Sequence, residues 1–373
     1  MTIRRRFLQT CSAAALPASL LPAAQAASPF SFILLGDLHY DSLSHHDLKW
    51  LDEHHAGDLS QIKNYSRLTT ETMPGLFAAV KQRIAALKDS AAPPAFVLQV
   101  GDLVEGLCGS TELSVRQNRE ALAFVAQQQL GVPFVFTKGN HDVTGDGAVE
   151  AFDEVLRPFM EQETHKVDAA AARTQASHTM TCGEAQFAFF DAYDKASLEW
   201  LEAVAARRTA RHFFVIIHPP VVPYGARASW HLYAGEKLKA QREKLLEVLG
   251  RQEAMVLGGH LHKYSALTRM AGGHSFTQLA VSSVVSALNQ KPKDVLHGMD
   301  SYTGDQVNLE PKHAPETAQA RRDIYAAERK VVTAFDYADT AGYAVVTVNG
   351  AQVEAAVHAG TQAEAFQTMK ISV

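Results

Sequence analysis

The chain has 373 residues, of which 47% are apolar, and a formal net charge of −5 at pH 7. This length and composition allow a large buried core, so we expect a globular protein. The acidic balance disfavours long nucleic acid as a partner or substrate, because such binding needs many Lys and Arg contacts with phosphates.

Residues 1–26 have the composition of an export signal. Arg4-Arg5 lies in a basic stretch that resembles the twin-arginine (Tat) signal, residues 13–21 form a short apolar core, and Ala24-Gln25-Ala26 fits a small-residue cleavage site. Two prolines argue against an ordinary N-terminal helix. We therefore expect a periplasmic or secreted bacterial protein that uses the Tat export machinery. Residues 27–373 would form one mature domain, with no membrane span after cleavage.

Cleavage would remove three arginines and no acidic residue, which lowers the net charge to −8. It would leave two cysteines, Cys108 and Cys182. Two cysteines do not define a disulfide framework, so we expect two separately buried free thiols.

Short apolar or β-branched runs, typical of buried strands, alternate with stretches of helical periodicity in the first half. The expected strands are residues 31–35, 95–100, 133–136, 179–182, 186–190, 213–217, 255–257, 343–348 and 352–357, with further antiparallel strands within 265–282. The expected helices are residues 76–87, 110–130, 152–160, 198–204, 236–249 and 316–332. Hairpin turns are expected at Gly183-Glu184 and, as type I′, at Asn349-Gly350. The pattern predicts an α/β fold in which two mixed sheets pack together with helices outside.

Two segments are harder to assign. Residues 41–70 contain the pairs His45-His46 and His54-His55, which fit an exposed amphipathic helix best, but also a further metal site or a lid over a pocket. Residues 283–315 carry three prolines and two glycines with little periodicity, which predicts a long loop.

Polar residues follow five of the expected strands. They are Asp37 with His39, Asp102, Asn140, His218, and His260 with His262. Ligands of open α/β sheets bind at the carboxyl ends of strands, so we expect these side chains to converge. Imidazole, carboxylate and amide oxygen ligands suit Mn, Fe or Zn. Seven ligands are too many for one tetrahedral ion and fit two ions that share a carboxylate, hold an attacking hydroxide and act on phosphorus.

His141 follows Asn140 directly and has no ligand role in this arrangement. Its imidazole is expected to hydrogen-bond or protonate the leaving oxygen.

The motifs together resemble those of a known family. Taken in order, Asp37-x-His39, Gly101-Asp102, Gly139-Asn140-His141-Asp142, His218 and Gly259-His260-x-His262 are similar to the motifs of calcineurin-like metallophosphoesterases. The resemblance covers residues 30–265 and leaves 283–373 as a C-terminal extension. It implies a four-layer αββα sandwich.

The resemblance also implies roles for individual residues. Asp37, His39 and His262 would hold one metal ion, and Asn140, His218 and His260 the other, with Asp102 bridging them. His141 would assist the leaving group. Glu105, three residues beyond the bridging Asp, would orient His141.

Three departures from the family pattern argue against particular groups of enzymes within the family. Gly106 stands where serine/threonine phosphatases have an Arg, and Glu105 stands where purple acid phosphatases have a metal-binding Tyr. Too few residues follow the motifs for the second domain of 5′-nucleotidases. We expect a hydrolase of small-molecule or lipid-type phosphate esters, with a phosphodiesterase favoured over a phosphomonoesterase. A catalytically inactive metal-binding protein is the other alternative, but such a protein would have no use for His141.

Overall fold

The structure is a computed structural model that describes residues 28–171, 175–305 and 316–371. The predicted export segment, residues 1–26, lies outside the described residues, as does the end of the predicted loop 283–315. None of the described helices is both long and apolar enough to cross a membrane.

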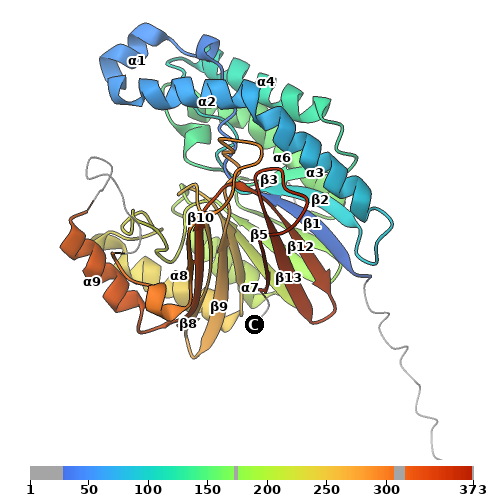
Figure 1. The fold of residues 1–373 in the computed structure, drawn as a ribbon, viewed down its shortest axis with the longest axis vertical. Coiled ribbons are helices and arrows are strands. Elements are labelled where there is room, and N and C mark those ends of the chain that lie inside the picture. The colour runs from blue at the N-terminus through green and yellow to red at the C-terminus, as the bar shows by residue number, and fades with distance from the viewer. Residues whose placement is uncertain (1–27, 172–174, 306–315, 372–373) are drawn as a thin grey trace, which may run out of the picture.

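Two mixed β-sheets form the centre of the fold (Figure 1). The six-stranded sheet has the order β14 (Gln367–Lys370), β13 (Gln352–Ala359), β12 (Gly342–Asn349), β1 (Phe30–Leu35), β2 (Pro94–Gln99) and β3 (Phe134–Phe136). The eight-stranded sheet has the order β10 (Lys293–His297), β11 (Val332–Asp339), β8 (Tyr264–Ala271), β9 (His274–Ala280), β7 (Met255–Gly258), β6 (His212–Ile217), β5 (Ala185–Phe190) and β4 (His178–Cys182).

Helices surround the two sheets. They are α1 (Leu48–His54), α2 (Leu59–Glu71), α3 (Met73–Leu87), α4 (Thr111–Gln127), α5 (Ala148–Ala151), α6 (Arg157–Val167), α7 (Ser197–Ala206), α8 (Lys239–Arg251) and α9 (Ala318–Glu328). In Figure 1, α1 to α4 lie at the top of the view, and α8 and α9 lie at the lower left. The predicted α/β fold of two packed mixed sheets flanked by helices is confirmed.

Apolar side chains fill three layers between these elements. The middle layer joins the two sheets, and there Phe32 stacks on Phe96 with ring centroids 5.1 Å apart and meets Phe214 edge to face at 5.6 Å. Neighbouring residues of β1 point the other way: Ile33 and Leu35 pack under α3 and α4. Strands buried on both faces read as continuous apolar runs, which is why β1 was recognisable from the sequence.

The C-terminal part differs from the expected one. The predicted loop 283–315 contains β10, an exposed edge strand, and a 3₁₀ turn at Met299–Ser301. The helix expected over 316–332 ends at Glu328, and Val332 begins β11. A polar edge strand has no alternation of apolar residues, so its sequence resembles a loop.

The structure confirms one of the two expected hairpin turns and corrects the other. The turn at Gly183-Glu184 is confirmed, because Cys182 pairs with Ala185. In the last hairpin Asn349 pairs with Gln352, so the turn residues are Gly350-Ala351, and Gly350 has φ +57. Asn349 and Ala351 have no positive φ, so the expected type I′ turn is wrong and a type II′ geometry replaces it.

The two described cysteines are free. Cys108 is buried, whereas Cys182 on β4 is only partly buried. The expectation of two free thiols therefore holds, but only one of them is fully enclosed.

Candidate metal centre

The predicted ligands meet at one edge of the two sheets. The chain passes Asp37 just after β1, Asp102 after β2 and His218 after β6. β1 runs parallel to β2, and β6 runs parallel to both β5 and β7. An isolated parallel bridge between Asp37 and Ser282 joins the two sheets at this edge. The topology of two packed sheets thus brings together residues that lie more than two hundred positions apart.

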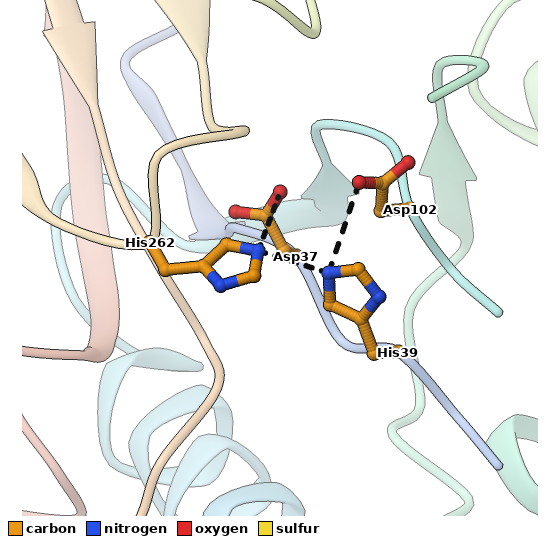
Figure 2. A group of neighbouring side chains, drawn as sticks. All are labelled: Asp37, His39, Asp102 and His262. Carbon is orange, nitrogen blue, oxygen red and sulfur yellow. Dashed lines mark hydrogen bonds and ion pairs between the residues drawn. The ribbon is translucent and has the colours of Figure 1, made fainter. Parts of the chain in front are cut away.

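One cluster consists of Asp37, His39, Asp102 and His262, whose ligand atoms all lie within 4.8 Å of one another. Figure 2 shows the imidazoles of His39 and His262 turned toward each other, with the two carboxylates beside them. The two Nε2 atoms are 2.9 Å apart. Oδ1 of Asp37 lies 3.7 Å from Nε2 of His262, and Oδ2 of Asp102 lies 3.7 Å from Nε2 of His39.

A second cluster consists of Asp102, His218 and His260. Nε2 of His218 lies 3.0 Å from Oδ2 of Asp102 and 3.2 Å from Nδ1 of His260. Asn140 lines the same cavity as Asp102 and His260. Asp102 belongs to both clusters, as a bridging ligand must.

Hydrogen bonds from the outer ring nitrogens orient these imidazoles. Nδ1 of His39 lies 2.7 Å from Oε2 of Glu105, and Nδ1 of His218 donates to the carbonyl of Val100 at 2.9 Å. In the neutral form of each ring, Nε2 is then the lone-pair atom that faces the centre. Metal-ligating histidines are commonly fixed in this way.

Two buried side-chain oxygens in the site lack a hydrogen-bond partner among the described residues: Oδ2 of Asp37 and Oδ1 of Asn140. A buried acceptor without a partner is costly, so its presence calls for an explanation. Coordination of a cation supplies one for both atoms, and oxygen with imidazole is a suitable set for Mn, Fe or Zn. The residues present therefore fit a dinuclear metal site.

Backbone conformation points to the same place. His39, Asp102, His260 and His262 have positive φ values of +48, +56, +73 and +54. Non-glycine residues rarely adopt this region, and each costs about 1–3 kcal/mol. Gly139 and Gly259 allow the loops to approach, since a Cβ on them would lie 2.1 Å from Oδ1 of Asp102 and 2.6 Å from Oδ2 of Asp37.

The carboxylates of the site favour the protonated form of two of the imidazoles, those of His39 and His218. Burial alone would lower the pKa of His39, but the hydrogen bond and charge of Glu105 outweigh it and raise this pKa to about 9. Burial alone would also lower the pKa of His218, but the charge and hydrogen bond of Asp102 outweigh it and raise this pKa to about 9. Burial lowers the pKa of His260 to about 3 and that of His262 well below its ordinary value, which keeps these rings neutral and able to ligate.

His141 and Glu105 are both present, but their contact differs from the expected one. Nδ1 of His141 donates to the backbone carbonyl of Glu105 at 2.7 Å, whereas the nearest carboxylate oxygen is 3.4 Å away. The Glu105 carboxylate is closest to His39 and also accepts a hydrogen bond from Gln61 at 3.0 Å. Glu105 therefore contacts His141 chiefly through its main chain, and its side chain supports a predicted metal ligand.

His39, Glu105 and His141 also form a compact group. The Nδ1 atoms of both rings are already engaged with Glu105. This group is accordingly a hydrogen-bonded support for the two clusters and does not form a third metal site.

Asp142 is a structural residue whose importance the sequence did not reveal, although it ends the quoted motif. Its buried carboxylate accepts hydrogen bonds from four backbone N–H groups. The donors are Gly139, Asp102, Leu103 and Val104, at distances from 2.8 to 3.2 Å. Asp142 therefore locks the loop after β3 to the loop after β2, and so fixes Asn140 relative to Asp102.

The 41–70 segment combines two of its expected roles. His45 and His46 are buried and contact Glu120 and Asp41 at 2.8 Å. Within the part of the chain that the structure describes, neither joins a group of metal ligands, so a further metal site is not supported. His54 is exposed on α1, as a solvated helix predicts.

The far end of this segment forms part of the wall of the active-site cavity. The cavity has a volume of about 400 Å³, within the usual range for ligand sites. His55, Asp58, Gln61 and Tyr65 line it together with His141 and Asn140. Tyr65 stacks on His39 with ring centroids 4.3 Å apart, and its hydroxyl lies 3.3 Å from Nδ1 of His262.

Arg227 and Trp230 also line the cavity, and no motif in the sequence marks either residue. The guanidinium of Arg227 lies over the Trp230 ring at 4.2 Å, and this ring lies 5.7 Å from that of His260. Tyr65, Arg227 and Trp230 belong to no motif, and only tertiary packing brings them to the centre.

Two mixed sheets carry a centre of His, Asp and Asn side chains at their strand ends, and this donor set suits a metal-binding protein. A family model for the calcineurin-like phosphoesterases matches residues 30–264, more than half of the chain. The chain therefore belongs to this family.

Solved structures show the same fold at low sequence identity. Purple acid phosphatase PPD1 from yellow lupin (Lupinus luteus) seeds is similar with a TM-score of 0.53 and 13% identity, over 93% of this chain and 54% of that chain. The structure of PhoD is similar with a TM-score of 0.50 and 14% identity, over 94% and 70%. The chain thus spans about half the length of the lupin enzyme, and these likenesses concern the fold alone. No curated protein matches the sequence.

Proposed function

We propose that this protein is a dinuclear metal-dependent phosphodiesterase in which His141 assists departure of the leaving group. The observation that supports it is a pair of His/Asp clusters that share Asp102, with His141 held beside them. When bound, two ions would supply an activated water as the nucleophile and neutralise charge on the phosphate.

His141 is placed for a role on the leaving group. Its Nδ1 is engaged with the Glu105 carbonyl, so Nε2 is left for the substrate. The imidazole lines the cavity together with Asn140 and is 19% exposed. An alkoxide leaving group needs a proton or a hydrogen bond, and a positioned general acid provides one.

The charges of the cavity support a diester as the substrate. Arg227 is the only Lys or Arg among the described residues that line it, and Asp58 adds a negative charge to the lining. A phosphate monoester carries nearly two negative charges at neutral pH, whereas a diester carries one. A single arginine beside the metal ligands therefore matches the diester better.

The decisive experiment compares p-nitrophenyl phosphate with bis-p-nitrophenyl phosphate. The protein is stripped of metal, reloaded with Mn, Fe or Zn, and assayed with both esters. We expect a higher kcat/KM for the diester with at least one of these metals. A higher kcat/KM for the monoester with all three metals would reject the diesterase assignment.

Export through a Tat-type signal is part of the proposal. It rests on the Arg4-Arg5 pair, the apolar stretch and the cleavage-like Ala24-Gln25-Ala26. Passage in the folded state would let the protein acquire metal before it leaves the cytoplasm. Replacing both arginines with lysine should retain the protein in the cytoplasm, and normal periplasmic levels of this variant would show that the signal is of another type.

A further inference from the structure

A second cavity adjoins the metal centre. It has a volume of about 290 Å³ and shares Arg227, His260 and His262 with the active-site cavity. The two cavities therefore lie on either side of the same ligands. Lys263, Asp294, Tyr337 and Asp339 give the second cavity its polar lining.

Tyr337 is the most unusual of these residues. The side chain is 1% exposed, and its hydroxyl has no hydrogen-bond partner among the described residues. Burial and the charges of Asp339 and Asp294 raise its pKa, so the hydroxyl keeps its proton. A buried hydroxyl without a partner destabilises a fold, and a ligand in the adjoining cavity would satisfy it.

Charged groups around this cavity are also incompletely paired. Lys263 forms an ion pair with Asp339. Within the described residues, by contrast, Asp294 and Arg227 have no oppositely charged group within ion-pair distance. The guanidinium of Arg227 stacks on Trp230, and none of the described residues accepts a hydrogen bond from its N–H groups, which can therefore donate to a ligand.

The loop that carries Arg227 is firmly anchored. Glu316 accepts hydrogen bonds from the backbone N–H of Ala228 at 2.9 Å and from Oγ of Ser229 at 2.8 Å. The hydroxyl of Tyr325 on α9 donates to the carbonyl of Gly225 at 2.9 Å. Arg227 is thus presented to both cavities by a rigid loop, as a binding residue needs to be.

We propose that this second cavity is the subsite for the ester group that a phosphodiester retains, and that Arg227 binds a phosphate oxygen between the two cavities. The retained group is a small polar alcohol residue that hydrogen-bonds to the hydroxyl of Tyr337 and to the Asp294 carboxylate. This inference rests on the proposed function and deepens it, because a monoester has no second ester group to fill the subsite.

The test uses two diesters with the same leaving group: propyl p-nitrophenyl phosphate and its terminally hydroxylated analogue. The metal-loaded wild type should prefer the hydroxylated ester. Tyr337→Phe should lower kcat/KM for that ester roughly 3- to 10-fold more than for the propyl ester, the usual effect of one neutral hydrogen bond. Its melting temperature should stay the same or rise, because the unpaired hydroxyl is gone.

Tyr343→Phe is the matched control. Its hydroxyl donates to the carbonyl of Gln362 at 3.2 Å, away from the second cavity. This variant should keep the ester preference of the wild type. An equal loss on both esters in Tyr337→Phe, or no preference in the wild type, would overturn the subsite.

Arg227 is tested by binding as well as by turnover. Arg227→Met should retain the metal content of the wild type and weaken binding of inorganic phosphate, measured by calorimetry, by about 10- to 100-fold, the range for a charged hydrogen bond. Unchanged phosphate binding would overturn the role of Arg227. If the wild type hydrolyses neither diester but does hydrolyse p-nitrophenyl phosphate, the diesterase assignment itself fails. If it hydrolyses both diesters equally, only the subsite fails.

Discussion

The side chain of Asp102 links the metal-ligand clusters to the backbone of His141. Oδ1 of Asp102 accepts a hydrogen bond from the main-chain N–H of His141 at 2.8 Å, while Oδ2 lies 3.0 Å from Nε2 of His218. One carboxylate thus faces the ligand clusters with one oxygen and fixes the start of the His141 turn with the other.

Asp102→Ala should therefore lose more metal than any other single ligand change. The substitution removes the side chain that both clusters share and the acceptor for the His141 backbone. Elemental analysis should find about two ions per chain in the wild type, as a shared-ligand site predicts, and less than one in the variant. Asp153→Ala, which alters an exposed side chain on the surface, serves as the control. One ion or fewer in active wild type would reject the dinuclear model.

His141→Ala should keep both metals and lose activity selectively. Alanine retains the backbone N–H that Asp102 accepts, so the ligand geometry is preserved. General acid assistance is typically worth ~10²–10⁴-fold, and a stable p-nitrophenolate needs little of it. The loss should thus be far larger for alkyl diesters than for p-nitrophenyl esters in steady-state assays. Equal losses on both substrates with weakened metal binding would mean that His141 only supports the Asn140 loop.

Glu105→Gln should act on metal affinity. Its carboxylate lies 2.7 Å from Nδ1 of His39, and removal of such an outer partner typically costs about 10- to 100-fold in metal affinity. The alkyl-to-aryl activity ratio should change little, because the main-chain carbonyl that holds His141 remains. Competition with a chelator measures the affinity, with Glu120→Gln as the control outside the site. A changed activity ratio at full metal affinity would restore the carboxylate as the group that orients His141.

Acid should destabilise the fold through buried neutral histidines. Burial lowers the pKa of His178 to about 4, and the ring stacks on Phe189 at 4.3 Å. The unfolded chain then binds a proton that the folded chain does not. The contribution of His178 is therefore complete above about pH 6.5 and is lost as the pH falls toward 4, at about 1.4 kcal/mol per pH unit.

Urea unfolding of the metal-free protein at several pH values tests this. In His178→Gln the slope of unfolding free energy against pH should be smaller between about pH 6.5 and pH 4. The matched change at the exposed His274 should leave the slope as in the wild type. An unchanged slope in His178→Gln would show that other groups dominate acid unfolding.

The residues at the strand ends could be predicted because their local signals are strong. An apolar run followed by Gly-Asp or Gly-Asn-His marks a buried strand and the loop after it, and parallel strands bring their carboxyl ends to one edge. Asp37, Asp102 and His218 follow that rule directly.

The cavity walls could not be predicted in the same way. Tyr65 is one of the buried positions of an amphipathic helix, and no feature of the surrounding sequence distinguishes it from the neighbouring buried residue Ile62. Arg227 lies in a loop whose course is set by hydrogen bonds to Tyr325 of α9 and to Glu316, which precedes that helix by two residues. Such contacts depend on how elements distant in the sequence pack together, and local sequence patterns do not predict this packing.

The pairing of β1 with β12 has a consequence for how the protein is made. Phe30 pairs with Val348 and Leu34 with Ala344, so the strand that leads to Asp37 and His39 obtains one of its two neighbours from the far end of the chain. Contacts of such sequence separation form late and slow the folding of a domain. During synthesis Asp37 and His39 therefore leave the ribosome long before β12. The edge of β1 that pairs with β12 stays unpaired until β12 has emerged. A nascent chain that stops before β12 should be cleaved readily by protease in the first hundred residues, whereas the finished chain should resist.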